Sequence, residues 1–373
     1  MRIGFVIYGS LDTLSGGYLY DRKLVEYLRA QGDTIVIISL PWRNYAVHLT
    51  DNFWFRLPPL NVIARRAFFR TKQSPDYEKF DILIQDELNH PSLIAANEGK
   101  HPYPVVSLVH HLRCSELRPK WQNILYRIVE QKYLQSVDGF ILNSQTTKNV
   151  VKGLIVKEKP SIVAYPPTDR FGDVILEDKI KERANSRELR ILFLGNVIER
   201  KGLHTLLNAL ARVEQNGILS YRLDVVGALT TDTTYVRAMQ KQVVINGLSS
   251  IVHFHGALNN DPLKGMLRQA HMVVVPSSYE GFGIVYLEGM AFGLPAIGTT
   301  AGAASEIITD GKTGYLIEPE DSKMLAVQLT SLAKDRDMLA RMSVNALRRY
   351  KAQPKWEQTA GQIREFLFER IRK

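Results

Sequence analysis

The chain has 373 residues, enough for two domains that each bury a core of their own. Hydrophobic residues make up 45% of the chain and charged residues 23%, which are ordinary proportions for a soluble globular protein. The formal net charge is +10, which predicts an anionic partner, but no recognisable nucleic-acid-binding module accompanies it.

Several classes of protein are excluded by what the sequence lacks. A single cysteine, Cys114, excludes an internal disulfide and every cysteine-rich metal site, and it fits a cytoplasmic protein. No apolar run reaches the ~20 residues that are needed to span a bilayer. Met1 and Arg2 lead directly into a strand-like run, which differs from a signal peptide.

Predicted strands and helices alternate along both halves of the chain. After the first strand, a loop with Ser15, Gly16 and Gly17 precedes an amphipathic helix. Such alternation predicts parallel sheets with right-handed crossovers, and the polar stretch 166–188 is the best linker candidate. We expect strands at residues 3–8, 34–40, 82–85, 105–110 and 139–143 of the first half, and at 190–194, 223–226, 252–255, 271–275 and 295–298 of the second.

Residues 273–295 carry the most informative pattern, VVVPSSYEGFGIVYLEGMAFGLP. A buried strand is followed by a turn that bears Glu280, and a helix then begins and carries Glu288. Strand, glycine-bearing turn and helix is a layout that directs backbone N–H groups toward an anionic ligand. A carboxylate such as Glu288 can accept hydrogen bonds from both hydroxyls of a ribose. The alternative interpretation is an ordinary solvated acidic helix start.

Two blocks closely resemble retaining glycosyltransferases of the GT-B fold, family 4, also called glycosyl transferases group 1. One block begins with Glu280 and Glu288 and continues through GMAFGLP at 289–295, GAASEII at 302–308 and DGKTGYL at 310–316 to Pro319. The other is ILFLGNVIERKG at 191–202. The resemblance is highly specific over residues 188–335 and weaker over the N-terminal half.

The resemblance implies an α/β fold with two Rossmann-like domains that face each other across a cleft. Residues 1–167 would form the acceptor-binding domain and residues 168–353 the nucleotide-sugar-binding domain. Residues 354–373 would form a helix that crosses back to the first domain. An ordinary final helix of the second domain is the alternative.

The implied activity is transfer of a hexose-type sugar from a UDP- or GDP-sugar to a hydroxyl of a glycan or lipid-linked acceptor, with retention of configuration. In the family's accepted mechanism, a front-face substitution, the leaving phosphate takes the acceptor proton. Double displacement would instead need a carboxylate nucleophile. Two other functions stay open: a nucleotide-sugar epimerase of related fold, which needs acid–base carboxylates in the N-terminal half, and a non-catalytic nucleotide-sugar-binding protein.

By resemblance, Lys201 contacts the donor diphosphate and Glu280 orients the sugar. The family often has an arginine directly after the strand glycine, whereas this chain has Asn196, so the second phosphate contact falls to Arg200 or is weakened. The alternative for Arg200 and Lys201 is a solvated basic turn. The expected catalytic residues are Glu280, His110 and Lys201, and the expected donor-binding residues are Gly16, Gly17, Asn196, Arg200, Lys201, Gly256, Ala257, Leu258, Glu280, Phe282, Gly283, Ile284, Val285 and Glu288.

The first domain is expected to contribute a histidine at the end of a buried strand. His110 best matches a family histidine that contacts the donor sugar, and His111 is the second choice; a structural, hydrogen-bonded histidine is the alternative. Asn143 and Ser144 resemble another turn of the family. The alternative is that they only cap the next helix. No Asp-x-Asp signature appears near these motifs and Asp232 has no partner acid at suitable spacing, so we expect no metal and no cofactor.

Residues 53–72 combine basic and aromatic side chains. They contain five basic residues and no acidic one, interleaved with Phe53, Trp54, Phe55, Phe68 and Phe69. This composition predicts that the segment docks on an anionic membrane surface, where a lipid-linked acceptor could enter the site. The alternative is a loop with buried aromatics and solvated arginines. We expect a cytoplasmic protein, peripheral on the inner face of the membrane, that does not bind nucleic acid.

Overall fold

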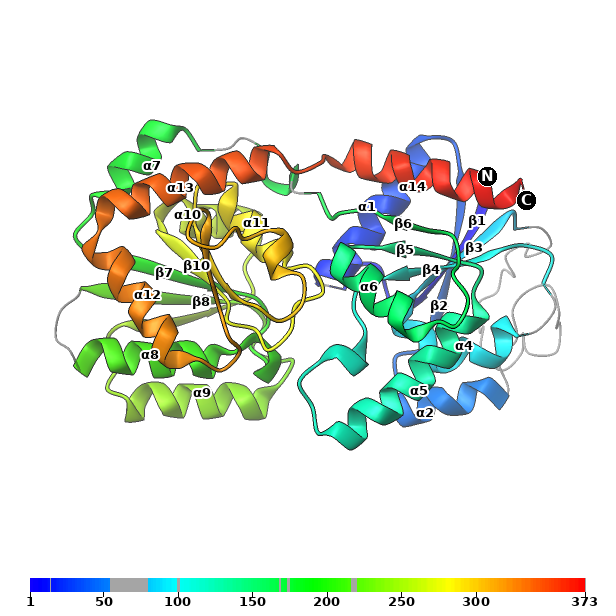
Figure 1. Ribbon diagram of the computed structural model, residues 1–373, viewed down its shortest axis with the longest axis horizontal. Coiled ribbons are helices and arrows are strands. Elements are labelled where there is room, and N and C mark those ends of the chain that lie inside the picture. The colour runs from blue at the N-terminus through cyan, green and yellow to red at the C-terminus, as the bar shows by residue number, and fades with distance from the viewer. Residues whose placement is uncertain are drawn as a thin grey trace. The chain divides into compact units, whose positions relative to one another are not determined.

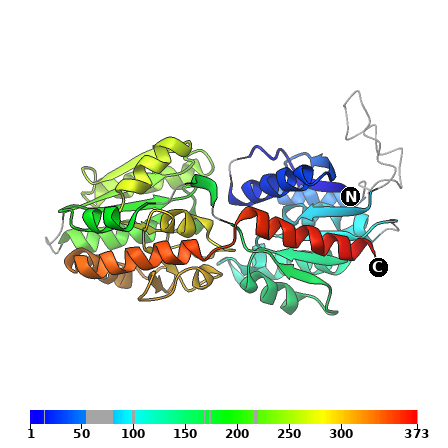
Figure 2. The ribbon, with the colours of Figure 1, turned by 90° about the horizontal axis from the view of Figure 1, so that it is seen from above.

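The computed structural model describes residues 1–13, 15–53, 80–98, 101–167, 169–172, 175–215 and 220–372. The chain divides into two compact units. The first consists of Met1–Pro167 together with Pro354–Lys373, and the second is Thr168–Gln353. Each unit contains one six-stranded sheet with helices packed against it (Figures 1 and 2).

The sheet of the first unit has the strand order β2-β1-β3-β4-β5-β6, and every neighbouring pair is parallel. β1 lies inside the sheet, with Ile3 opposite Ile35 of β2 and Ile82 of β3. The inner strands are rich in Val, Ile and Leu because both of their faces are buried. The strands are β1 (Arg2–Tyr8), β2 (Thr34–Leu40), β3 (Ile82–Asp86), β4 (Val105–Val109), β5 (Gly139–Leu142) and β6 (Ser161–Val163).

Two hydrophobic cores lie on opposite faces of this sheet. β1 contributes side chains to both cores, because successive side chains of a strand point to opposite faces of the sheet. Ile3 and Phe5 lie in one core, and Val6 and Tyr8 lie in the other. α1 (Gly16–Ala30) covers the first core. The second core is covered by α4 (His90–Asn97), α5 (Lys120–Ser136) and α6 (Gln145–Leu154), and α2 (Tyr45–Thr50) packs against α4.

The sheet of the second unit has the order β12-β11-β10-β7-β8-β9 and is also parallel throughout. Its strands are β7 (Leu189–Leu194), β8 (Tyr221–Val226), β9 (Val252–Gly256), β10 (Met272–Val274), β11 (Ala296–Thr299) and β12 (Gly314–Ile317). Its helices are α7 (Glu177–Ala184), α8 (Leu203–Gln215), α9 (Thr233–Ile245), α10 (Asn260–Gln269), α11 (Ile284–Met290), α12 (Ser322–Lys334) and α13 (Arg336–Lys351).

The last helix, α14 (Trp356–Ile371), belongs to the first unit, which confirms the expected return of the chain. It packs along α1 (Figure 1), and its buried Ile363 and Leu367 complete the core over β1. Arg364 donates from Nε to Asp33 Oδ2 at 2.7 Å, and the Thr359 hydroxyl donates to the Tyr165 carbonyl at 3.0 Å.

The expected strands are all present, and no end differs from its expected position by more than two residues. Two further strands, β6 and β12, lie at sheet edges where no strand was predicted. The stretch 166–188 is a linker only at its start, because the units divide after Pro167 and α7 within this stretch packs against α13.

Candidate functional site

The Arg200–Lys201 turn lies at the end of β7 and is fitted against the end of β10. The short 3₁₀ helix Glu199–Lys201 ends at Gly202, which has a φ of 70°. A Cβ at Gly202 would lie 2.1 Å from the Pro276 carbonyl oxygen, so only glycine allows this close approach. The fit places the Lys201 side chain beside the residues that follow β10.

Lys201 and Glu280 form a buried ion pair in the second unit. Lys201 Nζ contacts Glu280 Oε1, and the Ser277 hydroxyl donates to the same oxygen at 2.6 Å. Arg200 Nη1 lies 3.9 Å from Glu280 Oε2 and donates to the Tyr279 carbonyl at 2.8 Å. The structure therefore brings together the two cations and the carboxylate that sequence analysis selected.

Charge and burial compete at this pair. Burial by itself raises the pKa of Glu280, but the charges of Lys201 and Arg200 and the hydrogen bonds from Lys201 and Ser277 lower it to about 2. Burial lowers the pKa of Lys201, and Glu280 opposes that shift. Glu280 is therefore an ionised hydrogen-bond acceptor at neutral pH.

Glu288 lies on α11, is 5% exposed, and is paired with an arginine that sequence analysis did not select. Arg170 Nη1 contacts Glu288 Oε1, and Arg170 Nη2 donates to Asn260 Oδ1 at 2.9 Å. Burial raises the pKa of Glu288, and Arg170 opposes the shift. Oε2 of Glu288 makes no hydrogen bond within the described part of the chain.

The other expected donor residues lie at the same end of the second sheet. Asn196 follows β7, and its carbonyl accepts from the Ile198 N–H at 2.9 Å. Gly256 ends β9, and Ala257 and Leu258 follow it. Phe282 is buried, Gly283 precedes α11, and Ile284 and Val285 begin that helix half-buried. All of these residues therefore follow the C-terminal ends of strands, where α/β sheets bind ligands.

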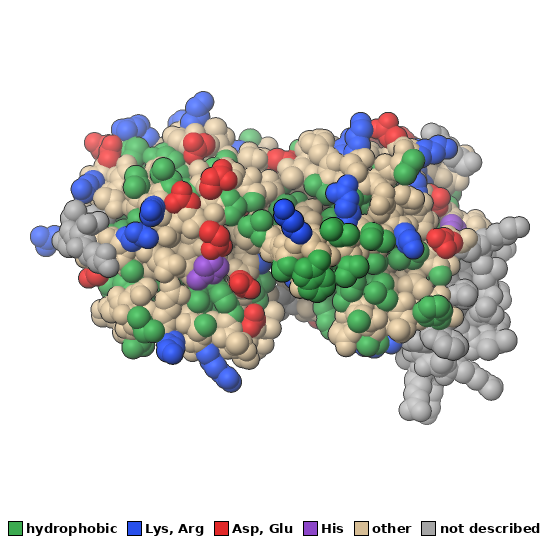
Figure 3. Space-filling view, turned by 60° about the horizontal axis from the view of Figure 1, so that its bottom comes forward, with side chains coloured by type: hydrophobic (Ala, Val, Ile, Leu, Met, Phe, Trp, Pro, Cys, Tyr) green, Lys and Arg blue, Asp and Glu red, His purple; other side chains and the backbone are tan. Residues whose placement is uncertain are grey.

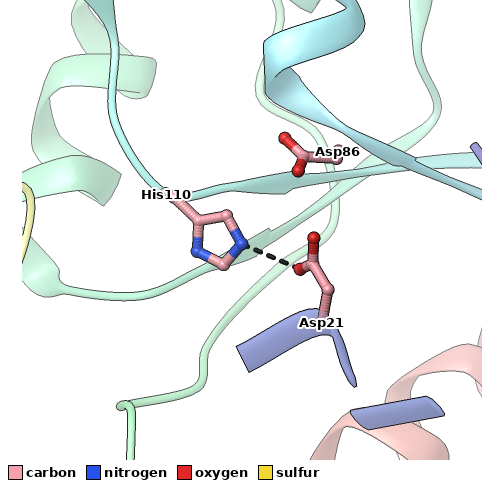
Figure 4. Close-up of side chains that lie close together, drawn as sticks. All are labelled: Asp21, Asp86 and His110. Carbon is pink, nitrogen blue, oxygen red and sulfur yellow. Dashed lines mark hydrogen bonds and ion pairs between the residues drawn. The ribbon is translucent and has the colours of Figure 1, made fainter. Parts of the chain in front are cut away.

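In the first unit, His110 follows β4 and is held from three sides. Its Nε2 lies 2.9 Å from Asp21 Oδ1, its backbone N–H donates to Glu87 Oε2 at 2.8 Å, and Asn143 Nδ2 donates to its carbonyl at 2.7 Å. Figure 4 shows the imidazole directed at Asp21, with Asp86 close to both side chains. A Cβ at Gly17 would lie 3.3 Å from the ring, so the Gly16–Gly17 start of α1 packs against His110.

Three buried carboxyl groups lie around His110, those of Asp21, Asp86 and Glu87. Burial raises the pKa of Asp21 to about 7 and holds those of Asp86 and Glu87 well above their usual range. Oδ2 of Asp21 and Oδ2 of Asp86 are buried without a hydrogen-bond partner among the described residues. Burial lowers the pKa of His110, and Asp86 opposes this shift. Burial therefore favours the neutral forms of the imidazole and of the carboxyl groups around it.

Three further sequence expectations concern this unit. His111, the second choice, contacts Glu116 at 2.7 Å. Ser144 caps α6 by accepting from the Thr147 N–H at 2.9 Å. The proposed membrane segment, residues 53–72, lies outside the described residues except for Phe53, which is 75% exposed. Within the described ranges, every helix is too short or too polar to cross a bilayer.

Comparisons with known proteins cover both units. The family model described as Glycosyltransferase Family 4 matches residues 20–170, and the one described as Glycosyl transferases group 1 matches residues 174–349. A phosphatidyl-myo-inositol mannosyltransferase of Mycobacterium leprae is 27% identical over 97% of this chain and 95% of that protein. An MMP alpha-(1->4)-mannosyltransferase of Mycolicibacterium hassiacum is 32% identical, over 46% of this chain and 41% of its own length.

Solved structures of the same fold extend over the whole chain. A sucrose-phosphate synthase from Thermosynechococcus elongatus has a TM-score of 0.77 at 19% identity and covers 99% of both chains. Anabaena HepE, crystallised with UDP and glucose, has a TM-score of 0.73 at 18% identity over 99% of this chain and 100% of its own. With a family model matching each half, the chain belongs to glycosyltransferase family 4, the glycosyl transferases group 1, and has the GT-B fold.

Proposed function

We propose that this glycosyltransferase transfers a hexose-type sugar from a UDP- or GDP-sugar to a hydroxyl acceptor with retention of configuration and without a metal. The observation that carries the proposal is the Lys201–Glu280 pair with Arg200 beside it, at the strand ends of the second unit. The second unit would bind the nucleotide-sugar and the first unit the acceptor.

Lys201 and Arg200 supply the positive charge that a departing diphosphate needs. Negative charge grows on the leaving phosphate as the glycosidic bond breaks, and cations fixed in advance stabilise that charge more than the ground state. The Lys201 ammonium is held by Glu280, and the Gly202 turn fixes its backbone. Arg200 lies on the same turn, so it is placed to supply the phosphate contact that Asn196 lacks.

Glu280 suits sugar binding better than acid–base or nucleophilic work. A pKa of about 2 makes it a weak base at neutral pH, and its ion pair further reduces its nucleophilicity. Its oxygens are fixed acceptors for donor-sugar hydroxyls. This arrangement favours front-face substitution, in which the leaving phosphate takes the acceptor proton, over double displacement through Glu280.

Glu288 would bind the ribose. Arg170 occupies one of its oxygens and leaves Oε2 to accept from the diol. His110 would present its other ring nitrogen, Nδ1, to a sugar hydroxyl, because Nε2 is occupied by its hydrogen bond with Asp21. The base would be read near Gly256–Leu258.

The relatives guide the choice of substrates. The relative from Mycobacterium leprae is named for transfer of mannose to a phosphatidyl-inositol, and HepE was crystallised with UDP. We therefore propose a hexose donor and a glycan or lipid-linked acceptor. A cytoplasmic location, peripheral to the membrane, fits such an acceptor.

A nucleotide-binding experiment tests the donor site. Calorimetry in excess EDTA with UDP, GDP, ADP and their sugars should find one nucleotide family that binds wild type. Lys201→Ala should weaken that binding by at least about tenfold, because one charge-assisted contact to phosphate is lost. Lys241→Ala, which removes an exposed lysine of α9, is the matched control and should bind as wild type does.

The double variant Lys201→Ala/Glu280→Gln separates two causes of that loss. Lys201→Ala alone leaves the buried Glu280 carboxylate without its closest cation, with only Arg200 at 3.9 Å, and this carboxylate repels phosphate. If Lys201 contacts the diphosphate, the double variant stays weak; if it recovers wild-type affinity, Lys201 only neutralises Glu280 and the proposal fails. Binding that appears only after Mg²⁺ or Mn²⁺ is added would contradict metal independence.

One observation bears on the epimerase alternative. That function needs carboxyl groups in the first unit, and Asp21, Asp86 and Glu87 are gathered there. Product analysis with a labelled donor decides between sugar transfer and epimerisation. Transfer releases free nucleotide together with a new glycoside, whereas epimerisation leaves the nucleotide attached to an altered sugar.

A further inference from the structure

One face of α5 in the first unit is apolar and exposed. Trp121, Ile124, Leu125 and Ile128 are 63%, 57%, 56% and 47% exposed, and Leu117 just before the helix is 62% exposed. Spacings of three, four and seven residues place the four helical side chains in one stripe. The opposite side of α5 is already buried, with Tyr133 and Leu134 in the core. The stripe is therefore a second apolar face that nothing in the described chain covers.

The exposed charges on α5 itself all have one sign. Lys120, Arg127 and Lys132 are exposed on α5. The sole acidic residue between positions 117 and 136 is Glu130, which is buried and accepts the backbone N–H groups of Arg113 and Cys114. Figure 3, with the lower side of Figure 1 turned forward, shows hydrophobic side chains gathered over the first unit.

A neighbouring helix, α2, contacts α5 through an aromatic pair. Tyr45 of α2 packs edge-to-face on Tyr126 of α5 with ring centroids 4.9 Å apart, which fixes the two helices side by side. Val47 of α2 is also exposed. α5 carries no exposed carboxylate, so the exposed charges on this helix are all positive.

We propose that the α5 face, formed by Leu117, Trp121, Ile124, Leu125 and Ile128, docks on an anionic lipid surface with the helix lying in the interfacial plane. Apolar side chains on one face and Lys or Arg beside them is the pattern of helices that lie on membranes, and a tryptophan favours the interfacial depth. Each basic residue near an anionic leaflet adds to the attraction.

The charge pattern also argues against a second copy of the chain as the occupant. A symmetric dimer through this face would bring Lys120, Arg127 and Lys132 of both copies together, and like charges at an interface are unfavourable. An anionic lipid surface carries negative charge, so it attracts these three basic residues. This docking is independent of the proposed donor site, so either proposal can fail without the other.

Vesicle co-sedimentation tests the docking surface. Wild type should bind phosphatidylcholine vesicles that contain phosphatidylglycerol, and high salt should weaken that binding. Leu125→Glu/Ile128→Glu should lower the partition coefficient at least about tenfold, because two carboxylates would enter the interface. The matched control, Val244→Glu/Ile245→Glu, adds the same charge at exposed apolar positions of α9 and should bind as wild type does.

Four outcomes would overturn the proposal. They are absence of wild-type binding, equal binding to vesicles without phosphatidylglycerol, equal loss in the α9 control, and light scattering that shows a dimer broken by the α5 variant. Thermal unfolding of both variants checks that they fold. A Lys120→Gln/Arg127→Gln variant should reduce the salt dependence while keeping the apolar face, which separates charge from burial.

Discussion

Asp21 is a fully buried carboxyl group whose protonation should be visible in the pH dependence of stability. Burial raises its folded-state pKa to about 7, against an unfolded value near 4. Between these values the folded state holds a proton that the unfolded state has released, so the free energy of unfolding falls as pH rises from about 4 to 7. The groups that face Asp21 are Asp86, Glu87, His110, Arg22, Tyr18 and Tyr20.

Asp21→Asn should remove this part of the pH dependence. Relative to wild type, the variant should gain stability from pH 4 to 7, by up to roughly 4 kcal/mol at about 1.4 kcal/mol per pKa unit. Thermal unfolding of both proteins across that range measures the gain, with exposed Asp261→Asn as the control. A difference that is constant with pH would mean that Asp21 is ionised throughout.

Single residues differ in how far the sequence reveals them. Lys201, Glu280 and Glu288 stand in motifs with fixed spacing, so they could be selected, and the structure places the first two in contact. Arg170 lies 118 positions from its partner Glu288 and belongs to no motif, so only the fold reveals the pair. Asp21 is one polar residue within an amphipathic helix, and its buried position depends on how α1 packs on the sheet.

At the scale of elements, strands that are buried on both faces were predictable and edge strands were not. β1 and β7 are long apolar runs, which is the signature of a parallel sheet interior. β6 consists of three half-buried residues, and β12 has four residues of which the middle two are half-buried, so neither stands out from a loop. α7 is rich in charge, and its two buried residues, Ile180 and Ala184, give so weak a periodic signal that the sequence predicts a linker there.

The turn after β7 offers a test of how the elements hold the donor site. Gly202→Ala should cost roughly 2–4 kcal/mol, because it combines a left-handed conformation with a Cβ 2.1 Å from the Pro276 carbonyl. Gly247→Ala is the matched control, since its φ is 69° and no atom lies within 4 Å of the added Cβ, and it should cost about 1 kcal/mol. Thermal unfolding measures both, and nucleotide affinity should fall in Gly202→Ala alone. Equal effects would mean that the contact with β10 is unimportant.

At the scale of the whole molecule, the chain passes between the units twice. It leaves the first unit after Pro167 and returns at Pro354, so residues near both ends of the sequence share one core. Leu367 of α14 is fully buried in the core that contains Ile3 and Phe5 of β1. α13 ends only a few residues before α14 yet packs in the other unit. We therefore expect a core substitution to destabilise the unit in which the residue is packed, whatever its distance along the chain.

Leu367→Ala tests whether packing within a unit or proximity along the chain decides which elements are destabilised. A cavity in the first core should cost about 2–5 kcal/mol and weaken hydrogen-exchange protection in β1, more than 350 positions away in the sequence. Protection in α13 should stay unchanged. Leu347→Ala is the matched control, because this leucine of α13 is equally buried but lies in the second unit. It should produce the reverse pattern, with β7 affected and β1 spared. If Leu367→Ala instead lowers protection in α13 and leaves β1 intact, the final helix is energetically part of the second unit, and the return of the chain contributes no stability to the first.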